Sequence, residues 1–484
     1  MEVIIPDTNM AAIMPQVLLT LGAALVLLLS VFFHGTRKWL SYLSFLTCAA
    51  AFVSLITLWH TDARIFSGML TIDGYTNAFS AIILVCVGMI CLITHGGVDE
   101  QKTGEFYSVV LLSTLGMIIM ASTQNLMVIF LGLEIMSIGL YILIGLNRAR
   151  VRALEAGLKY FLLGAFASGF FLYGIALTYG ATGSFDLVRI TQYIKMNSLL
   201  GDPLMLVGTG LLLIGFGFKV ALIPFHMWTP DVYQGAPAPI TAFIATGPKA
   251  AAFAAFGRVF MVALADLHFD WSTVVFWICV ITIIGGNLLA LIQQDIKRML
   301  AFSSIAHAGY IIMSILAGPV LAEKNPDWAS SALIFYVVVY ALTNVIAFSV
   351  IYIFENREGR NLKVEHFAGF GFRYPMLSIA MSVAMLSMAG FPLTGGFIGK
   401  LQVFSAAVDA GYVGLTVIAV MMSVVSVYYY LGVIVKMFFT EAEETLEDVA
   451  VPRATWFTIL ASTLVVVLLG IMPATMTELF KSLV

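Results

Sequence analysis

The feature that most constrains this chain is a series of fourteen apolar segments separated by short loops. Each is close to the roughly 20 residues that a helix needs to cross a bilayer. The 484-residue chain is 61% hydrophobic and 11% charged, whereas a soluble domain is usually about 25% charged. Because backbone groups must be paired within lipid and no credible strand pattern is present, we predict an all-α integral membrane protein without a separate soluble domain. The predicted spans are 11–33, 40–59, 74–95, 106–122, 125–146, 154–179, 203–225, 239–262, 272–292, 300–317, 330–354, 375–405, 412–438 and 454–478.

The distribution of Lys and Arg predicts how these helices are oriented. Loops after odd-numbered spans hold 14 of the 24 basic residues, and loops after even-numbered spans, with the C-terminal tail, hold 5. Short loops rich in Lys and Arg generally stay in the cytoplasm. We therefore expect the odd-numbered loops in the cytoplasm and both termini outside.

Four ionisable side chains stand in the middle of apolar segments, where lipid alone would not tolerate them. A charge at the bilayer centre costs roughly 3 kcal/mol even on the mildest scales, so such residues normally face a polar interior and mark an ion or proton path. Desolvation favours the neutral form of a lysine, and a nearby carboxylate favours the charged form. We therefore predict a proton relay in which the one carboxylate is the partner of the nearest lysine. The four residues are Glu134, Lys219, Lys249 and Lys400.

A short repeated motif predicts the internal organisation. The pattern G-F-x-x-K occurs at 215–219 in the seventh span and at 396–400 in the twelfth. An offset of five helices is odd, so the second copy enters the membrane from the opposite side, and helices 4–8 and 9–13 become two inverted five-helix repeats. The chain then divides into four parts. They are an N-terminal three-helix segment (1–100), a first repeat (105–263), a second repeat (272–438) and a C-terminal helix (454–484).

Helix-breaking residues surround three of the lysines. Proline removes a backbone donor and glycine loosens a helix, and unpaired backbone groups survive in a membrane only beside protein or water. We therefore predict that helices 7 and 12 are broken next to Lys219 and Lys400, with a similar break before Lys249. Kinked helices that only serve packing are the alternative. The predicted breaks lie at Gly215, Gly217, Pro224, Pro248, Pro392, Gly395 and Gly396.

Other residues give weaker indications. Lys159 suits either proton entry or a side chain that reaches toward the membrane surface. His226 suits a gate or a helix cap, and His307 suits a relay or a neutral histidine of the core. The four cysteines lie in apolar segments without metal-ligand spacing, so we predict no metal or iron–sulfur site in this chain.

Three stretches of sequence resemble a known family. The run KVALIPFHMWTPDVYQGAPAP at 219–239, supported by 303–310 and 386–397, resembles the antiporter-like membrane subunits of proton-pumping NADH–quinone oxidoreductase, respiratory complex I. The resemblance covers nearly the whole chain. Within the family, the Tyr-Gln-Gly-Ala-Pro run, Lys249 and a lysine rather than a glutamate at 400 resemble the subunit N branch.

The resemblance implies a function. Glu134 and Lys219 would form a modulating pair, Lys249 a central connector and Lys400 the terminal exchanger of a path from the cytoplasm to the outside of a bacterial inner membrane. NADH, FMN, iron–sulfur clusters and quinone would be bound by other subunits, and no cofactor by this chain. The implied partners are neighbouring antiporter-like and small membrane subunits and lipids, without nucleic acid.

Two other functions remain open from the sequence. A subunit of a Na⁺/H⁺ antiporter shares the lysine–glutamate arrangement. A structural membrane anchor of a hydrogenase-type complex would keep the helices without needing the buried lysines.

Overall fold

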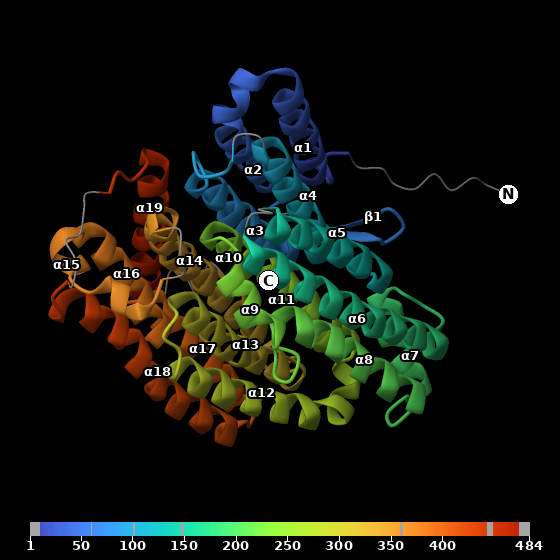
Figure 1. Cartoon of the computed structure of the whole chain (residues 1–484). Coiled ribbons are helices and arrows are strands. Elements are labelled where there is room, and N and C mark those ends of the chain that lie inside the picture. Colours follow the sequence, from blue (N-terminus) through green and yellow to red (C-terminus); the bar gives the residue numbers. More distant parts are fainter. Residues whose placement is uncertain are drawn as a thin grey trace.

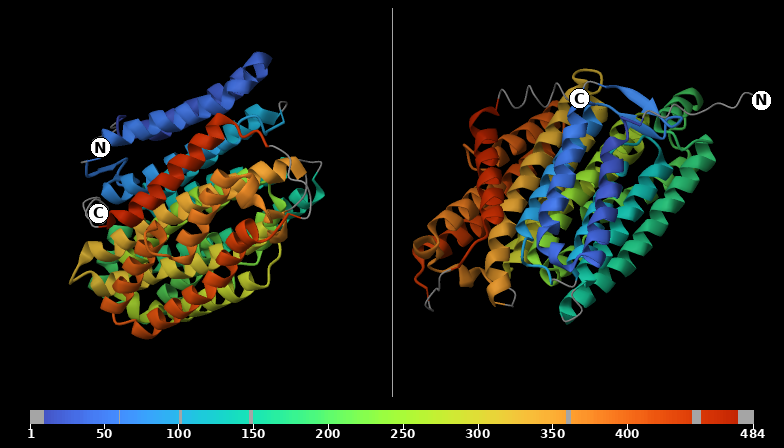
Figure 2. Two further views of the ribbon diagram at one scale, coloured as in Figure 1. Left: turned by 90° about the vertical axis from the view of Figure 1, so that its left-hand side faces the viewer. Right: turned by 90° about the horizontal axis from the view of Figure 1, so that it is seen from above.

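The computed structural model is a bundle of long helices that run side by side (Figures 1 and 2). It describes residues 10–59, 61–99, 102–146, 150–358, 362–442 and 449–473. The predicted terminal residues 1–9 and 474–484 lie outside this range. The long helices are α1 (Met14–Phe32), α2 (Leu40–Ile56), α3 (Gly74–Ile93), α4 (Thr103–Ala121), α5 (Leu126–Gly145), α6 (Val151–Thr182), α8 (Pro203–Val220), α12 (His268–Leu291), α13 (Ile296–Leu321), α14 (Pro326–Glu358), α18 (Val413–Phe439) and α19 (Arg453–Ile471). The shorter helices are α7 (Leu187–Asn197), α9 (Trp228–Gly235), α10 (Ala238–Ala245), α11 (Gly247–Gly257), α15 (Phe370–Arg373), α16 (Pro375–Ala389) and α17 (Gly395–Asp409). Short 3-10 segments are η1 (His34–Trp39), η4 (Ala265–Leu267) and η5 (Val364–Phe367), and η3 (Arg258–Ala263) is a short π-helix.

The prediction of an all-α membrane protein is confirmed. Within the described residues, thirteen helical stretches are long and apolar enough to cross a membrane. The difference from the predicted fourteen lies at 375–405, which consists of two helices of 15 residues each, α16 and α17. Neither half is long enough to span a bilayer alone, because a helix rises 1.5 Å per residue.

The expectation that the chain has no strands is wrong in one place. Two short strands, β1 (Ala63–Ile65) and β2 (Leu70–Ile72), pair antiparallel between α2 and α3. The turn between them uses positive φ at Phe66, Ser67 and Gly68. Three residues per strand are too few to produce a visible alternating pattern in the sequence.

Side chains of Asp and Asn start several helices. Each accepts a hydrogen bond from a backbone N–H of the first turn, which has no partner within its own helix. These capping residues fix where the helix begins after a short loop. They are Asp73, Asn125, Asp186, Asp202 and Asp295.

Two membrane helices are interrupted. The helix α8 ends at Val220, where Ala221 takes a left-handed conformation (φ 65°), and the chain resumes as α9 after a linker at 221–227. The helix α16 ends at Ala389, the next residue Gly390 takes a left-handed conformation (φ 87°), and α17 begins at Gly395. Between α10 and α11 only Thr246 leaves the helical conformation, and Pro248 stands in the first turn of α11.

The predicted break at Gly215 and Gly217 is wrong, because α8 is continuous through both. These glycines permit close packing instead. A Cβ at Gly215 would lie 2.5 Å from the ring of Phe171, and one at Gly217 would lie 2.8 Å from the ring of Phe225. The interruption comes after Lys219 rather than before it.

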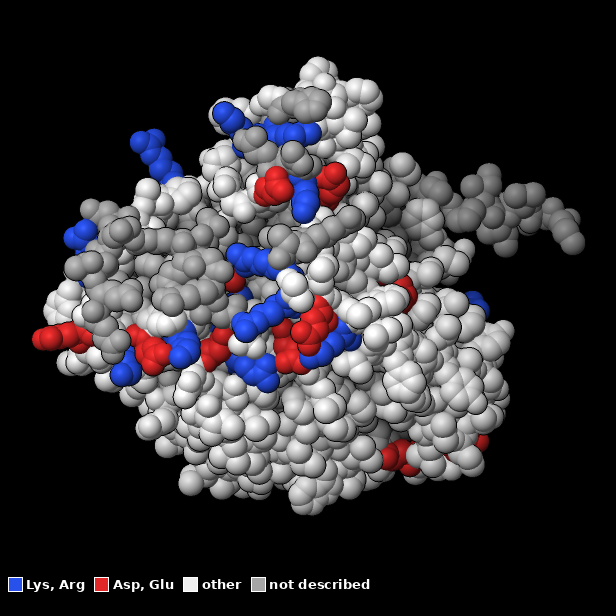
Figure 3. All heavy atoms as spheres, in the orientation of Figure 1, with Lys and Arg blue, Asp and Glu red and all other residues white. Residues whose placement is uncertain are grey.

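Burial places α13, the α10–α11 pair and α14 in the centre of the bundle, since nearly all of their described side chains are buried. The helices α6, α12 and α18 expose apolar side chains on one side, as expected for contact with lipid. On the face shown in Figure 3, many charged residues gather in a band across the middle, and few lie below it. The lysines inside apolar segments are therefore held by central helices or by helices packed on them.

Candidate functional site

The first buried lysine, Lys219, lies in the last turn of α8, directly before the interruption, and is 5% exposed. Its Nζ donates to the Ser137 Oγ of α5 at 2.7 Å. The rings of Tyr141, Tyr160 and Phe218 lie 5.6–5.8 Å from Nζ. Aromatic faces at this distance attract a cation, so the pocket can hold the charged lysine while offering it a single hydroxyl acceptor.

The structure places Glu134 near this lysine but not in direct contact with it. The Oε1 of Glu134 accepts from the Ser168 Oγ of α6 at 2.5 Å. Ser137, the acceptor of Lys219, is on the same helix as Glu134, three residues later. Among the ion pairs between described residues there is none between Glu134 and Lys219. Lys219 therefore contacts the face of α5 that carries Glu134, but the two predicted partners do not contact each other directly.

The second buried lysine, Lys249, lies in the first turn of α11, beside the interruption at Thr246, and is 2% exposed. Its Nζ donates to the carbonyl oxygen of Ser304 at 3.0 Å and also to the Ser304 Oγ. The same Oγ accepts from the Tyr340 hydroxyl at 2.7 Å and lies 3.1 Å from the Tyr233 hydroxyl. A lysine is therefore connected to two tyrosines through one serine.

His307 continues this polar line along α13. Its Nδ1 lies 2.8 Å from the Tyr336 hydroxyl, and its Nε2 lies 3.1 Å from the Tyr430 hydroxyl. The Tyr430 hydroxyl also bonds to the Ser303 Oγ. Both ring nitrogens therefore meet hydroxyl groups, an arrangement that fits a relay and equally a neutral histidine of the core.

The third buried lysine, Lys400, lies in the second turn of α17 and is 5% exposed. Its Nζ donates to the carbonyl oxygen of Ala389 at 2.9 Å and to the Ser423 Oγ at 2.7 Å. Ala389 is the last residue of α16, so the interruption supplies the acceptor. The Tyr310 ring lies 5.1 Å from Nζ.

One helix connects the second and third lysines. The residues Ser304, His307 and Tyr310 follow each other at intervals of three on α13, and side chains at this spacing share a helix face. Ser304 contacts Lys249, and the Tyr310 ring lies over Lys400. The face of α13 therefore forms a polar line across the apolar centre of the bundle.

Lys159 and His226 do not join this line. Lys159 has a side chain that is 47% exposed and pairs with Glu155 at 2.8 Å and with Asp231 at 3.1 Å. His226 is half-buried in the linker after α8, where its Nδ1 has no hydrogen-bond partner among the described residues.

The sequence analysis missed two buried charged residues. Lys297, counted there as a loop residue, is 1% exposed, and Glu355 is 3% exposed. Their side chains form an ion pair of 2.9 Å. Each stands at the edge of an apolar run, where the sequence pattern does not separate a surface position from an interior one.

The polar line has no metal-binding character. No group of three or more His, Cys, Asp or Glu side chains that could hold a metal ion occurs among the described residues. The four cysteines are buried and unpaired with each other by disulfides. The lysine, histidine, serine and tyrosine side chains of the polar line can each give or accept a hydrogen bond or a proton.

Comparison with known proteins agrees with this geometry. Residues 122–426 match the family model described as "NADH:quinone oxidoreductase/Mrp antiporter, TM". A relative from Trichlorobacter lovleyi, named NADH-quinone oxidoreductase subunit N, is 43% identical over 94% of this chain and 91% of its own length. A chain of respiratory complex I from Thermus thermophilus with bound aureothin superposes with a TM-score of 0.80 at 34% identity, over 96% of this chain and 99% of that one.

A chain of the Mrp complex from a Dietzia species shares the fold alone. Its TM-score is 0.84 at 20% identity, over 98% of this chain and 97% of that one. The matched region of the family model includes the three helix interruptions and the four ionisable residues first singled out in the sequence, of which the three lysines are buried and Glu134 is half-buried. The chain therefore belongs to the NADH:quinone oxidoreductase/Mrp antiporter transmembrane family.

Proposed function

We propose that this protein is a proton-translocating membrane subunit of an NADH–quinone oxidoreductase. The observation that carries the proposal is the polar face of α13, on which Ser304 bonds to Lys249, His307 bonds to two tyrosine hydroxyls and the Tyr310 ring lies over Lys400. Buried lysines beside broken helices are costly to keep in a membrane unless the charge is used. In the proposed relay Lys219 is at the other end, where it contacts the face of α5 that carries Glu134.

In this proposal protons move from the cytoplasm to the outside of a bacterial inner membrane, with both chain termini outside. The excess of Lys and Arg in the odd-numbered loops supports this orientation. Glu134 and Lys219 act as the modulating pair. When the distance between Glu134 and Lys219 changes, Lys219 alternates between holding and releasing its proton. Lys249 connects Lys219 to Lys400, and Lys400 exchanges the proton with the exit side.

The division into two inverted repeats is part of the proposal. Its support is a matching feature at two helix starts. Asn125, which caps α5, forms an isolated antiparallel bridge with Asp186, and Asp295, which caps α13, forms one with Lys363. The two helices are the second helix of the first and of the second proposed repeat, and an inverted relation puts the two bridges on opposite faces.

The redox chemistry belongs to other subunits in this proposal. NADH, FMN, iron–sulfur clusters and quinone would be bound there, and the energy would reach this chain through neighbouring antiporter-like and small membrane subunits, with lipids around them. The name of the Trichlorobacter relative and the complex I structure support this assembly. A Na⁺/H⁺ antiporter subunit is less favoured, because identity to the Mrp chain is 20% against 43% to the subunit N relative.

The test is NADH-driven acidification of inside-out vesicles that carry Lys219→Ala, with assembly checked on a native gel. We expect a fully assembled complex that has lost pumping together with quinone reduction. Lys324→Ala is the matched control, because Lys324 is exposed and its loss should change nothing. Normal pumping by an assembled Lys219→Ala complex would contradict the relay, and proton exchange that needs Na⁺ but not NADH would favour the antiporter.

A further inference from the structure

A second carboxylate–lysine pair is buried at the end of the bundle where α5 ends and α13 begins. Glu355 of α14 accepts from the Nζ of Lys297 at 2.9 Å through Oε1 and from the backbone N–H of Ala238 at 2.8 Å through Oε2. Arg150 adds a longer contact of 3.5 Å to Oε1. With one carboxylate and two cations, the cluster has an excess positive charge when all three groups are ionised.

This pair is unlike the ion pairs on the surface nearby. Taking both charges out of water is costly, and removing one partner leaves the other uncompensated. An exposed pair such as Lys363–Glu365, at 51% and 62% side-chain exposure, has no such cost. A buried carboxylate–lysine pair can avoid this cost if one proton moves from the lysine to the carboxylate, because both groups are then neutral. Glu355 and Lys297 are such a pair, whereas Arg150 stays charged.

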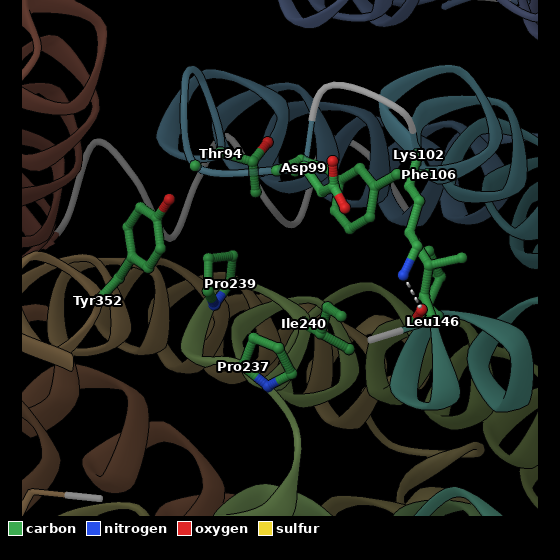
Figure 4. Close-up of a pocket in the computed structure, with 12 residues that line it drawn as sticks. Thr94, Asp99, Lys102, Phe106, Leu146, Pro237, Pro239, Ile240 and Tyr352 are labelled. Carbon is green, nitrogen blue, oxygen red and sulfur yellow. Dashed lines mark hydrogen bonds between the residues drawn. The ribbon is translucent and has the colours of Figure 1, made fainter. Parts of the chain in front are cut away.

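A cavity borders the segment whose backbone donates to Glu355 (Figure 4). Its volume is about 120 Å³, enough for several water molecules. Pro237 and Pro239 line it, and the residue between them is Ala238, whose N–H donates to Glu355. Tyr352, one turn before Glu355 on α14, lines it as well.

Two charged side chains line the same cavity. Asp99 and Lys102 line it, and the Lys102 Nζ donates to the carbonyl oxygen of Leu146 at 3.1 Å. Water that reaches Asp99 and Lys102 therefore shares a cavity with Pro237 and Pro239, the two neighbours of the residue that donates to Glu355.

From Lys297, polar groups of α9 and α13 lead toward Lys249. Lys297 also donates to the carbonyl oxygen of Ala236 at 2.8 Å, next to α9. Tyr233 of α9 reaches the Ser304 Oγ at 3.1 Å, and Ser304 holds Lys249. Lys297 and Ser304 are seven residues apart on α13, which is two turns, or about 10 Å along the helix.

We propose that the Glu355–Lys297 pair is the site where protons enter the relay from the water-filled cavity. This inference rests on the proposed function. A proton from cavity water binds the Glu355 carboxylate and opens the ion pair with Lys297. It then moves over the two turns of α13 through water, Tyr233 and Ser304 to neutral Lys249, which becomes charged. The Glu355 carboxylate is restored and pairs again with Lys297. The charged or titratable groups around the carboxylate are Lys297, Arg150 and Tyr352.

The test compares Glu355→Gln and Glu355→Asp in assembled complexes. Glutamine still accepts from the Ala238 N–H but carries no proton, so we expect pumping to fall at least about tenfold. Aspartate keeps an ionisable carboxyl and should retain more activity than glutamine. The matched control is Glu365→Gln, whose carboxylate is exposed and whose loss should leave pumping unchanged.

Rescue of pumping by a small weak acid distinguishes a proton-carrying role of Glu355 from a structural role. Formate added to Glu355→Gln vesicles can deliver protons through the cavity, so we expect it to raise pumping severalfold, with a steeper gain at lower pH. Formate should not help Lys219→Ala. An assembled Glu355→Gln complex that pumps normally, or one that is inactive and not raised by formate, would overturn the entry site.

A second variant leaves the buried pair intact. Val98 lines the cavity, and Val98→Trp should fill it and slow pumping, whereas Val98→Ala should not. If Val98→Trp pumps normally, the cavity is not the route. If the Lys219→Ala complex also pumps normally, the proposed function itself is wrong. If the Glu355→Gln complex pumps normally but the Lys219→Ala complex does not pump, only the entry site is wrong.

Discussion

The two lysines of the repeated G-F-x-x-K motif occupy different environments. Lys219 precedes its interruption, donates to one hydroxyl and is surrounded by three aromatic rings, with Glu134 on the helix that supplies the hydroxyl. Lys400 follows its interruption and donates both to the carbonyl of Ala389 and to Ser423. Among the described residues, Lys400 has no carboxylate in ion-pair contact.

The difference indicates how one motif can serve two tasks. A carboxylate near Lys219 makes its charged form sensitive to small movements, because the attraction between two charges depends on their separation and is strong in a medium of low polarity. The fixed carbonyl of Ala389 gives Lys400 an acceptor without a charge that can move. We therefore interpret Lys219 as the adjustable member of the relay and Lys400 as the exchanger.

Lys400→Arg tests whether the exchanger must release a proton. Arginine keeps the positive charge but stays protonated under all working conditions, so pumping should fall by at least about 100-fold, or roughly 2.7 kcal/mol in barrier height. The measurement is NADH-driven acidification of vesicles with assembly verified. Near-normal pumping by this variant would show that Lys400 acts only as a fixed charge.

Glu134→Gln tests whether the carboxylate distinguishes the two regions. Glutamine can still accept from Ser168, but it removes the charge that favours protonated Lys219, so we expect pumping to fall about tenfold, equivalent to about 1.4 kcal/mol. The same vesicle assay measures it. Ser168→Ala is the control for the lost hydrogen bond and should have the smaller effect. Equal effects of the two variants would assign the role of Glu134 to packing.

Ser137→Ala and Ser423→Ala test the number of acceptors. Lys219 loses its one hydroxyl acceptor in the first variant, whereas Lys400 keeps the Ala389 carbonyl in the second. One neutral hydrogen bond contributes about 1 kcal/mol. We therefore expect the first variant to slow pumping about fivefold and the second less than about twofold. The reverse order would contradict the comparison.

The sequence was sufficient for the spans and for the three buried lysines, because both depend on long apolar runs that lipid requires. It also located the interruptions approximately, through Pro224 and Pro392. It misplaced the first by several residues, since Gly215 and Gly217 serve packing against Phe171 and Phe225 rather than a break. A glycine in a membrane helix has either use, and only the neighbouring helix decides between them.

The polar face of α13 and the pair of Glu355 with Lys297 were not predictable in the same way. Ser304 and Tyr310 are ordinary residues in a membrane helix, and their role depends on which lysine the fold brings to them. Lys297 and Glu355 stand at the edges of apolar runs, 58 residues apart. Long-range contact of this kind leaves no periodic signal in a single sequence.

The smallest predicted effect concerns the contact between the two proposed repeats at the surface. Asp231 of α9, outside the membrane-length helices, pairs with Arg298 of α13 at 2.8 Å and with Lys159 at 3.1 Å. Burial alone would raise the pKa of the Asp231 carboxyl, but hydrogen bonds and charges from Arg298 and Lys159 hold that pKa below its usual range. A carboxyl with a lowered pKa in the folded state stabilises the protein above about pH 4 and loses this contribution as the pH falls through the folded value.

Asp231→Asn should therefore destabilise the assembled complex at pH 7 by less than about 1 kcal/mol, measured as a small fall in its thermal midpoint. The effect is small because the carboxylate is about one-third exposed and screened by solvent. The difference from the unmodified protein should shrink at high salt and should also shrink as the pH falls below about 4. Asp409→Asn, at an exposed position, is the control at each condition. A difference that stays constant from pH 7 to below the folded pKa and at high salt would mean that Asp231 supports the surface contact through packing rather than through its charge.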